Sequence, residues 1–399
     1  EIVELNVLNS TFTGNQAHYG AGIGLIDTPL VSSDPPSSKR ARPERTTALE
    51  TGEAASTGST AFTTSSRDLI FPPISTYIVV DSSSMLENVC QFGGCAIYIS
   101  PLSATTITIL RSIFQDNQLN LTDYCSQGWP SFAVSASAIS MAMQSSAGEA
   151  PSASSFNLIN STIGMNLITV PSECSIGRSS LIMLHQVIDS TIQNIHFDKI
   201  NWWSSGSFSL VLIRRFWHAV LDGVVVSDCR IQDHNKAFDI QDDLAVFTMV
   251  NPAPSVSVRN CVFDSNRAGT ILYIVNVNSV VIKNTIHIDK APENYFRQPT
   301  VISLNAIFSS VWIANWTSST TAHPIYIANT PSLTLSDIHI DAYTSIPGVS
   351  SLTLVGIANA TIEDSTWSNC SPSAISASSS DLTIINSRFV QNDGGTLLP

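Results

Sequence analysis

The stretch Leu5–Phe12, which reads Leu-Asn-Val-Leu-Asn-Ser-Thr-Phe, decides the fold of this chain. Apolar residues alternate at Leu5 and Val7, and after a small residue at Ser10 they resume at Phe12 in the opposite phase. Alternation with a period of two is typical of a strand with one buried face. A straight strand cannot change phase without turning its apolar side chains outward, so we expect two short strands joined by a sharp bend.

The same pattern recurs along the chain in about twelve copies. Asn often occupies the bend, as at Asn9, Asn160 and Asn260, and Asn tolerates positive φ and bonds its own backbone. Looser copies centre on Ile195, Thr285 and Trp316. The clear copies begin at Leu5, Ile78, Ile107, Phe156, Val224, Val256, Leu333, Ala360 and Leu382.

The later copies follow one another every 22 to 34 residues, and none shows helical spacing. Coils of that length with two or three strands each predict an all-β, three-sided parallel β-helix. We expect one solenoid of about twelve coils over residues 1–399, in which each coil is stabilised by its neighbours. The apolar positions, such as Val256 and Val258, should point inward and stack from coil to coil.

A second motif, F-x-x-N, occurs at Phe12–Asn15, Phe114–Asn117, Phe263–Asn266 and Phe389–Asn392, and a Gly-Gly-Cys-Ala-Ile run stands at Gly93–Ile97. These motifs resemble the F-x-x-N and G-G-A-I repeats of polymorphic outer-membrane proteins, within the pectin-lyase-like class of right-handed β-helices. The resemblance implies a right-handed solenoid. It implies no single function, because this class holds lyases, hydrolases, adhesins and structural rods.

Composition narrows the function classes. Ser and Thr supply 93 residues, charged residues only 12%, and the net charge is −13. An acidic chain lacks the basic surface that nucleic acids require. No apolar run reaches the length of a membrane helix, and we expect a processed product or a segment of a longer protein, located outside the cell or at its surface. Residues 28–74, rich in Ser, Thr and Pro, should form a loop inserted in the solenoid, and 118–131 a long turn.

Cysteines and glycosylation motifs add little information about the function. The seven cysteines are too few for a disulfide framework, and their spacing fits no zinc site, so we expect no metal and no cofactor. Cys229 and Cys261 fall in the same slot of two consecutive copies, which predicts that they stack with Cα atoms about 4.8 Å apart, as buried free thiols or as a strained bridge. The N-x-S/T sequons permit a secretory location, and they stand at Asn9, Asn120, Asn160, Asn315, Asn359 and Asn369.

One segment could carry hydrolase chemistry. Phe238–Asp243 contains Asp239, Asp242 and Asp243 and is similar to the Q-D-D segment of polygalacturonase-like hydrolases, in which paired carboxylates act across a glycosidic bond. The Gly-His-Gly element of those enzymes does not follow. The other interpretation is a solvated acidic turn, which we favour.

A pectate-lyase mechanism would need an acidic calcium site and an exposed arginine as the base. Arg214, Arg215 and Arg259 are candidates for the base, but no matching group of carboxylates stands out in the sequence. Nor does the chain hold a G-x-S-x-G element for nucleophilic catalysis.

Aromatic residues offer a binding function instead. Trp202, Trp203 and Trp217 could stack against sugars, although one member of each adjacent aromatic pair should fill the core. We therefore expect a structural or adhesive rod, a segment or subunit of a filament, whose partners are other chains end to end, parent-protein segments or glycans. The alternative is a hydrolase or lyase acting on acidic glycans.

Overall fold

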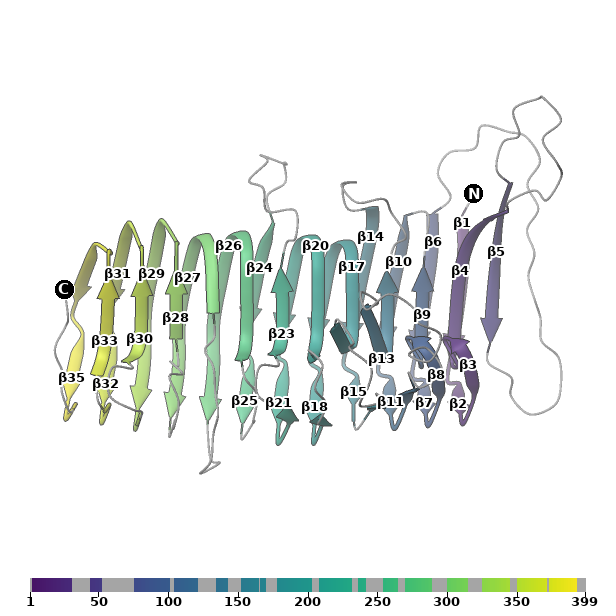
Figure 1. Cartoon of the computed structure of the whole chain (residues 1–399), viewed down its shortest axis with the longest axis horizontal. Coiled ribbons are helices and arrows are strands. Elements are labelled where there is room, and N and C mark those ends of the chain that lie inside the picture. The colour runs from purple at the N-terminus through teal and green to yellow at the C-terminus, as the bar shows by residue number, and fades with distance from the viewer. Residues whose placement is uncertain are drawn as a thin grey trace.

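The computed structural model is a solenoid of parallel strands whose long axis runs from the N-terminal to the C-terminal coil (Figure 1). It describes residues 2–30, 44–51, 75–100, 104–120, 134–142, 152–164, 166–169, 178–202, 208–231, 236–241, 254–264, 270–288, 300–314, 325–344, 350–371 and 373–392. All regular elements in these ranges are strands. The all-β prediction is therefore confirmed for this part of the chain.

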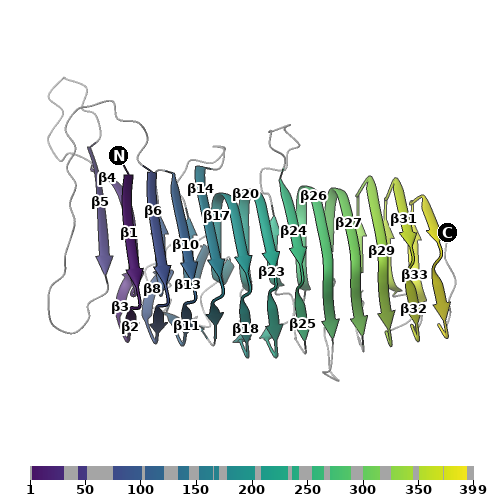
Figure 2. The same cartoon turned by 180° about the vertical axis from the view of Figure 1, so that it is seen from behind.

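Three long ladders of parallel strands run side by side along the axis (Figures 1 and 2). The first joins strands that carry the apolar-x-apolar half of the repeat. In order it contains β1 (Ile2–Leu8), β6 (Ser75–Asp81), β10 (Thr105–Leu110), β14 (Ser152–Ile159), β17 (Arg178–Gln193), β20 (Phe208–Asp222), β24 (Ser255–Arg259), β26 (Thr270–Ile288), β27 (Thr300–Ala314), β29 (Ser332–Asp341), β31 (Asn359–Glu363) and β34 (Leu382–Ile385).

The second ladder carries the other half of the repeat, after the bend. It joins β2 (Thr11–Thr13), β7 (Ser84–Leu86), β11 (Ile113–Gln115), β15 (Thr162–Ile163), β18 (His196–Asp198), β21 (Val225–Ser227) and β25 (Val262–Asp264), then the C-terminal parts of β26, β27 and β29, and finally β32 (Thr366–Ser368) and β35 (Arg388–Val390).

The third ladder lies between the second ladder of one coil and the first ladder of the next. It joins β4 (Ile23–Leu30), β9 (Ile97–Ser100), β13 (Val134–Ala142), the N-terminal parts of β17 and β20, β23 (Lys236–Gln241), the N-terminal parts of β26 and β27, β28 (Ile325–Ala328), β30 (Ser350–Val355) and β33 (Ser373–Ser378). Smaller sheets hold β3 (Gln16–Tyr19), β8 (Val89–Gly93), β12 (Gln118–Asn120) and β16 (Leu167–Thr169), and β19 (Asn201–Trp202) with β22 (Arg230–Ile231).

The interior is one continuous core of stacked side chains. Val256 and Val258 are 2% and 0% exposed, as the alternation predicts. Leu5 aligns with Ile78, Ile107 and Phe156 in successive strands of the first ladder. Most core residues belong to a single cluster that extends over the stacked coils, so each coil buries its apolar face against the coils on either side.

Positive φ values mark the bends between ladders. Asn9, Asn160, Asn260 and Asn386 precede the second ladder and have φ between 47° and 53°, as expected for Asn at these positions. A second set of such residues follows the second ladder, including Gly14 and Asp116. Each coil therefore turns sharply twice within a few residues.

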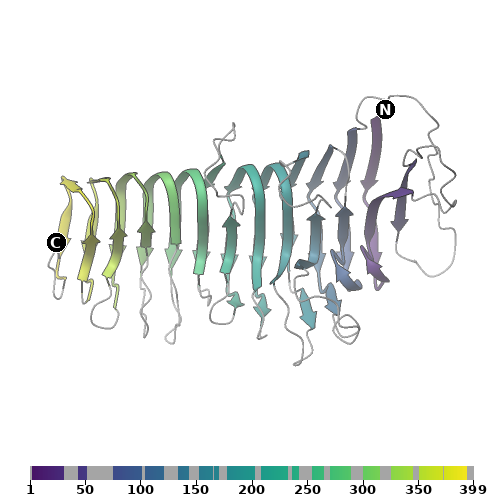
Figure 3. The same ribbon diagram turned by 45° about the horizontal axis from the view of Figure 1, so that its top comes forward.

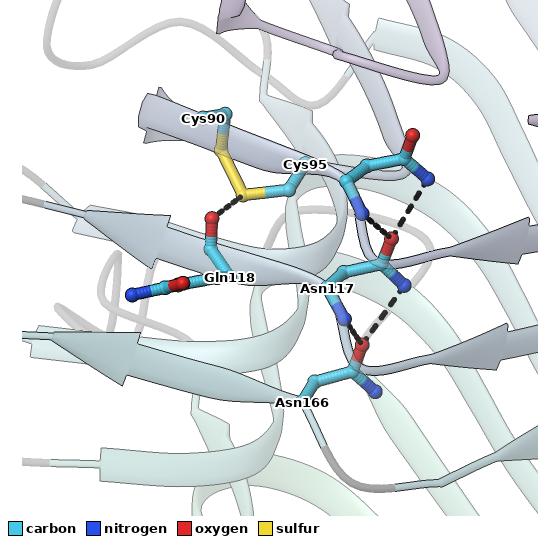
Figure 4. Close-up of a disulfide and its surroundings, with 6 residues drawn as sticks. Cys90, Cys95, Asn117, Gln118 and Asn166 are labelled. Carbon is cyan, nitrogen blue, oxygen red and sulfur yellow. Dashed lines mark hydrogen bonds between the residues drawn. A yellow bond between two sulfur atoms is a disulfide. The ribbon is translucent and has the colours of Figure 1, made fainter. Parts of the chain in front are cut away.

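Asn117, the last residue of the F-x-x-N motif Phe114–Asn117, belongs to a buried ladder of asparagine side chains at the second bend (Figure 4). The Asn88 side chain donates to Asn117 Oδ1 at 2.9 Å, and Asn117 donates to Asn166 Oδ1, also at 2.9 Å. The backbone N–H groups of Asn88 and Asn117 donate to the same two oxygens. One carbonyl oxygen per coil thus accepts two hydrogen bonds from the coil before it.

A disulfide joins Cys90 to Cys95 beside this ladder, and the sequence did not indicate it (Figure 4). The chain turns between them at Gly94, whose φ is +58°. A Cβ on Gly94 would lie 2.4 Å from the Ile97 carbonyl oxygen, so only glycine fits there.

The position in the repeat that was predicted for Cys229 is wrong by five residues. Val226 pairs with Phe263, so Val224 occupies the position of Cys261 in the ladder. Cys229 lies three residues after Val226. It therefore occupies the position that asparagine fills at the second bend of other coils. The predicted stacking of the two cysteines is therefore wrong. Both are buried free thiols, the first of the two predicted redox states.

The copy predicted at Trp316 is displaced in the same way. Thr285 pairs with Val311, and Trp316 lies outside the described residues. Both errors have one cause: an apolar-x-apolar pair precedes each of the two bends in a coil, so the repeat can be matched to the wrong bend.

The predicted loop over 28–74 is partly wrong. β4 continues to Leu30, and β5 (Glu44–Thr51) pairs with it as an antiparallel strand at the N-terminal end of the third ladder (Figure 1). The β-branched Thr46 and Thr47 favour an extended strand. Within the predicted turn over 118–131, Gln118–Asn120 forms β12. The other residues of both segments lie outside the described ranges.

Candidate functional site on the outer face of the third ladder

A row of buried side chains lies on the outer face of the third ladder. In β20, Val211 and Ile213 point into the core, so Leu212 and Arg214 point outward. In β23, Phe238 and Ile240 point inward, so Asp239 points outward. Outward residues of a solenoid normally meet water, yet Leu212, Arg214 and Asp239 are only 2%, 5% and 2% exposed.

Strand register places these residues in adjacent coils. Met183, Leu212, Asp239 and Tyr273 follow one another across β17, β20, β23 and β26. Met183 and Leu212 form an apolar cluster separate from the interior core. The outer face is therefore apolar on one side of Asp239 and aromatic on the other.

Arg214 and Asp239 form an ion pair, with 3.5 Å between Nη2 and Oδ2. Burial raises the pKa of the Tyr273 phenol, and the Asp239 carboxylate raises it further by opposing the phenolate, while the Arg214 guanidinium lowers it. Tyr273 thus lies within electrostatic range of both charges and stays protonated. A buried charge pair of this kind is strongly destabilised when one partner is removed.

This arrangement differs from a glycosidase centre. Glycoside hydrolysis uses two carboxylates, one on each side of the scissile bond. Asp239 is buried in β23 and paired with an arginine, so the favoured interpretation as a solvated acidic turn is wrong for this residue. Asp242 and Asp243 lie outside the described residues. The structure therefore unites Asp239 with Arg214 and Tyr273, two residues that were not predicted as its neighbours. The signal in the sequence was the position of all three between inward-pointing apolar residues.

The tryptophan candidates are not brought together in the described part of the chain. Trp202 pairs with Ile231 through its backbone in the β19–β22 sheet, and Trp203 lies outside the described ranges. In β20, Phe216 is buried in the core and the adjacent Trp217 is half-buried. That pair follows the predicted division, in which one ring of each pair fills the core.

Several sequon asparagines lie at exposed positions. Asn9, Asn160, Asn359 and Asn369 are exposed, Asn120 is half-buried, and Asn315 lies outside the described residues. The Asn369 side chain donates to Asp341 at 2.9 Å. This bond and another from Ser368 lower the pKa of the Asp341 carboxyl, the Ser368 bond being the stronger cause.

The free thiols within the described ranges are inert by burial. Burial raises the pKa of the Cys229 thiol to about 12, and those of Cys261 and Cys370 to about 11. A neutral thiol is a poor nucleophile and a poor metal ligand. No group of three or more His, Cys, Asp or Glu residues suited to a metal occurs in the part of the chain that the structure describes. That part also holds no helix with the length and hydropathy of a membrane span.

Comparison with known proteins yields a distant structural likeness. No protein-family model matches this chain, and no curated protein matches it in sequence. Among solved structures, it is similar to PfbA, a surface adhesin of Streptococcus pneumoniae, at 10% sequence identity. The match covers 79% of this chain and 83% of the adhesin, with a TM-score of 0.31.

Proposed function

We propose that this chain is a right-handed, three-sided β-helix of about twelve coils, of the pectin-lyase-like class, that serves as a structural or adhesive rod at the cell surface. The observation that carries the proposal is the continuous interior core, which extends through the stacked coils. A solenoid in which every coil is stabilised by the coils on either side is a stiff spacer.

The exterior supports a binding role over a catalytic one. Thr334, Thr361 and Thr383 align on the outer face of three successive strands of the first ladder. Such a row presents hydroxyl groups at the strand spacing of about 4.8 Å, with no charge to repel an acidic surface. Glycans and the polar surfaces of proteins can accept hydrogen bonds from such a row.

The alternative function is a hydrolase or lyase on acidic glycans. Asp239 gives it little support, because its carboxylate is buried and paired with Arg214. A substrate could reach the Asp239 carboxylate only by displacing the atoms that bury it.

The test compares binding with cleavage. The purified chain is incubated with immobilised acidic and neutral polysaccharides, and both retained protein and released sugar are measured. We expect retention without release, and weaker retention for Thr334→Val/Thr361→Val, which removes the hydroxyl groups at nearly unchanged size, with Thr11→Val/Thr13→Val at exposed positions of the second ladder as the matched control. If the unchanged chain releases sugar and this release is lost in Asp239→Asn or Asp242→Asn, the chain is a hydrolase or lyase and the proposed rod function is wrong.

A further inference from the structure

Three chemically complementary side chains follow one another on the outer face of the first ladder. Asp189 of β17 pairs with His218 of β20, and His218 pairs with Ser255 of β24. Ala219 and Val256, the next residues along, lie in the core, so His218 and Ser255 point outward. The three strands are neighbours in the middle of the solenoid (Figures 2 and 3). Carboxylate, imidazole and hydroxyl are therefore placed in that order, with Cα atoms about 4.8 Å apart from coil to coil.

Asp189 fixes the orientation of the His218 imidazole. His218 Nδ1 lies 2.7 Å from Asp189 Oδ1. A carboxylate only accepts hydrogen bonds, so Nδ1 donates, and a neutral ring then keeps its lone pair on Nε2. Nδ1 and Nε2 lie on opposite edges of the ring. The edge that carries Nε2 therefore faces away from Asp189, toward the coil that holds Ser255.

The Ser255 hydroxyl is open to this base. Ser255 is half-buried, and its side chain makes no hydrogen bond with another described residue. Asp189 and His218 are both exposed, so a substrate can reach the imidazole. A serine becomes nucleophilic when a positioned base can take its proton. This constellation recurs on unrelated folds and is recognised by geometry, so the lack of a G-x-S-x-G element does not exclude it.

Two other exposed histidines are arranged differently. His339 contacts Asp337 through Nε2, at 2.8 Å, and not through Nδ1. His196 Nε2 lies 2.9 Å from Ser227 Oγ, but that hydroxyl donates to a neighbouring carboxylate. In both cases the nitrogen that would act as the base is already engaged. Of these three histidines, only His218 turns Nε2 toward a serine with no other bond among the described residues.

Apolar residues border the three side chains. Ile188, Trp217 and Pro254 each come directly before one of them in the sequence, and all three are half-buried. Trp217, which was predicted to stack against sugars, is the neighbour of His218. Partly exposed apolar side chains beside a few placed polar groups are typical of a substrate site.

A second hydroxyl on the same strand has no partner. Ser257 follows Ser255 by two residues on β24, and its Oγ is buried without a hydrogen bond among the described residues. A buried polar group without a partner is rare in native proteins. An oxygen that becomes negative beside Ser255 would accept this bond, as a substrate oxygen does in an oxyanion hole.

The geometry points to a triad that hydrolyses carboxylic esters, with Ser255 as the nucleophile, His218 as the base and Asp189 as the positioning residue. Ser255 Oγ bonds to the acyl carbon while its proton passes to His218 Nε2, and the alcohol leaves with that proton. Water then attacks the acyl-serine by the same route, which releases the acid and restores the serine. Trp217 favours an ester with an apolar part. This activity is separate from the rod function and releases no sugar.

Hydrolysis of p-nitrophenyl acetate by the purified chain tests the reaction. The matched controls are Ser279→Ala, at the equivalent half-buried position of the next coil, and His339→Gln, at an exposed histidine paired with a carboxylate. We expect Ser255→Ala and His218→Gln to lower kcat at least about 100-fold, which is the contribution of a positioned general base. Both controls should keep the activity of the unchanged chain.

Two further variants test the supporting groups. Asp189→Asn should lower kcat and leave KM unchanged, because Asp189 acts on the imidazole and not on the substrate. Asp189→Glu should restore part of kcat, since a carboxylate can again accept from Nδ1, and a purely structural role would not produce this rescue. Ser257→Ala should lower kcat about tenfold or more, as expected for the loss of an oxyanion donor.

A fluorophosphonate ester identifies the nucleophile, because an activated serine displaces fluoride and retains the phosphonyl group. Peptide mass spectrometry should place this group on Ser255 in the unchanged chain and find none in His218→Gln. Hydrolysis that persists in Ser255→Ala would show His218 acting as a simple surface imidazole and would overturn the proposal. An unchanged chain that cleaves no ester would also overturn it, and the proposed rod function would stand in either case.

Discussion

Replacing Asn117 by alanine should open the solenoid locally, because this side chain sits in the middle of the asparagine ladder. Asn117 is fully buried. Its Oδ1 accepts from the N–H and the side chain of Asn88, and its Nδ2 donates to Asn166 Oδ1 and to the Met85 carbonyl oxygen at 2.9 Å. Alanine keeps none of these bonds.

The cost follows from the groups left behind. Two buried donors of Asn88 and the carbonyl oxygen of Met85 lose a partner, and each such group costs about 1–3 kcal/mol. Allowing for partial relaxation, we expect a loss of about 3–5 kcal/mol of local stability. Since each coil contacts only its neighbours, the loss should be confined to the coils that contain β7, β11 and β15.

Hydrogen exchange measured strand by strand checks this expectation. Amide exchange in β7 and β11 should accelerate at least about 100-fold, since each 1.4 kcal/mol is a factor of ten, while β29 and β31 stay unchanged. Asn6→Ala serves as the control, because Asn6 is exposed and its side chain bonds only Glu4 among the described contacts. An acceleration below threefold in β7 and β11, or one spread evenly over the chain, would refute the reasoning.

Three further expectations follow from buried groups. The Cys229 thiol, whose pKa burial raises from 9.0 to about 12, should resist thiol reagents at pH 8 until the chain is unfolded; the free energy of unfolding should fall as pH rises from about 9 to 12, because the unfolded thiol ionises first. Rapid labelling of the native chain would contradict this. Asp239→Ala should lower the free energy of unfolding in urea by about 3–5 kcal/mol, and the double change Asp239→Leu/Arg214→Met should recover most of that loss. Equal losses of stability in the single and the double variant would argue against the ion pair. Reducing the Cys90–Cys95 disulfide should cost roughly 2 kcal/mol, seen as faster exchange in β8 alone, and unchanged exchange there would show that the bond is not stabilising.

The sequence predicted the interior better than the bends. The phase change between Leu5 and Phe12 identified the inward positions, because apolar residues alternate with a period of two in any strand that has one buried and one solvent-exposed face. It could not separate the two bends of a coil, since an apolar pair precedes both, and this led to the misplaced slot at Cys229. The motif Phe114–Asn117 was visible, but the hydrogen-bonded ladder it forms requires the register of neighbouring coils.

The candidate site was harder to predict because it depends on contacts between coils. Asp239 was identified from its neighbours in sequence, yet its real partner, Arg214, lies in the preceding coil at a separation that no local motif encodes. The bond between Cys90 and Cys95 was missed for a related reason: the chain turns at Gly94, and only its three-dimensional path brings the sulfurs together.

The hydrogen bond between Ser10 and Ser83 spans 73 residues, and the one between Ser365 and Ser387 spans 22, although each joins adjacent coils. The height of a coil is set by the strand spacing of about 4.8 Å, whatever the number of residues in its turns. Length in this molecule is consequently counted in whole coils. Residues added at a turn enlarge the girth and can elaborate a recognition surface, while the reach of the rod changes only when a complete coil is gained or lost.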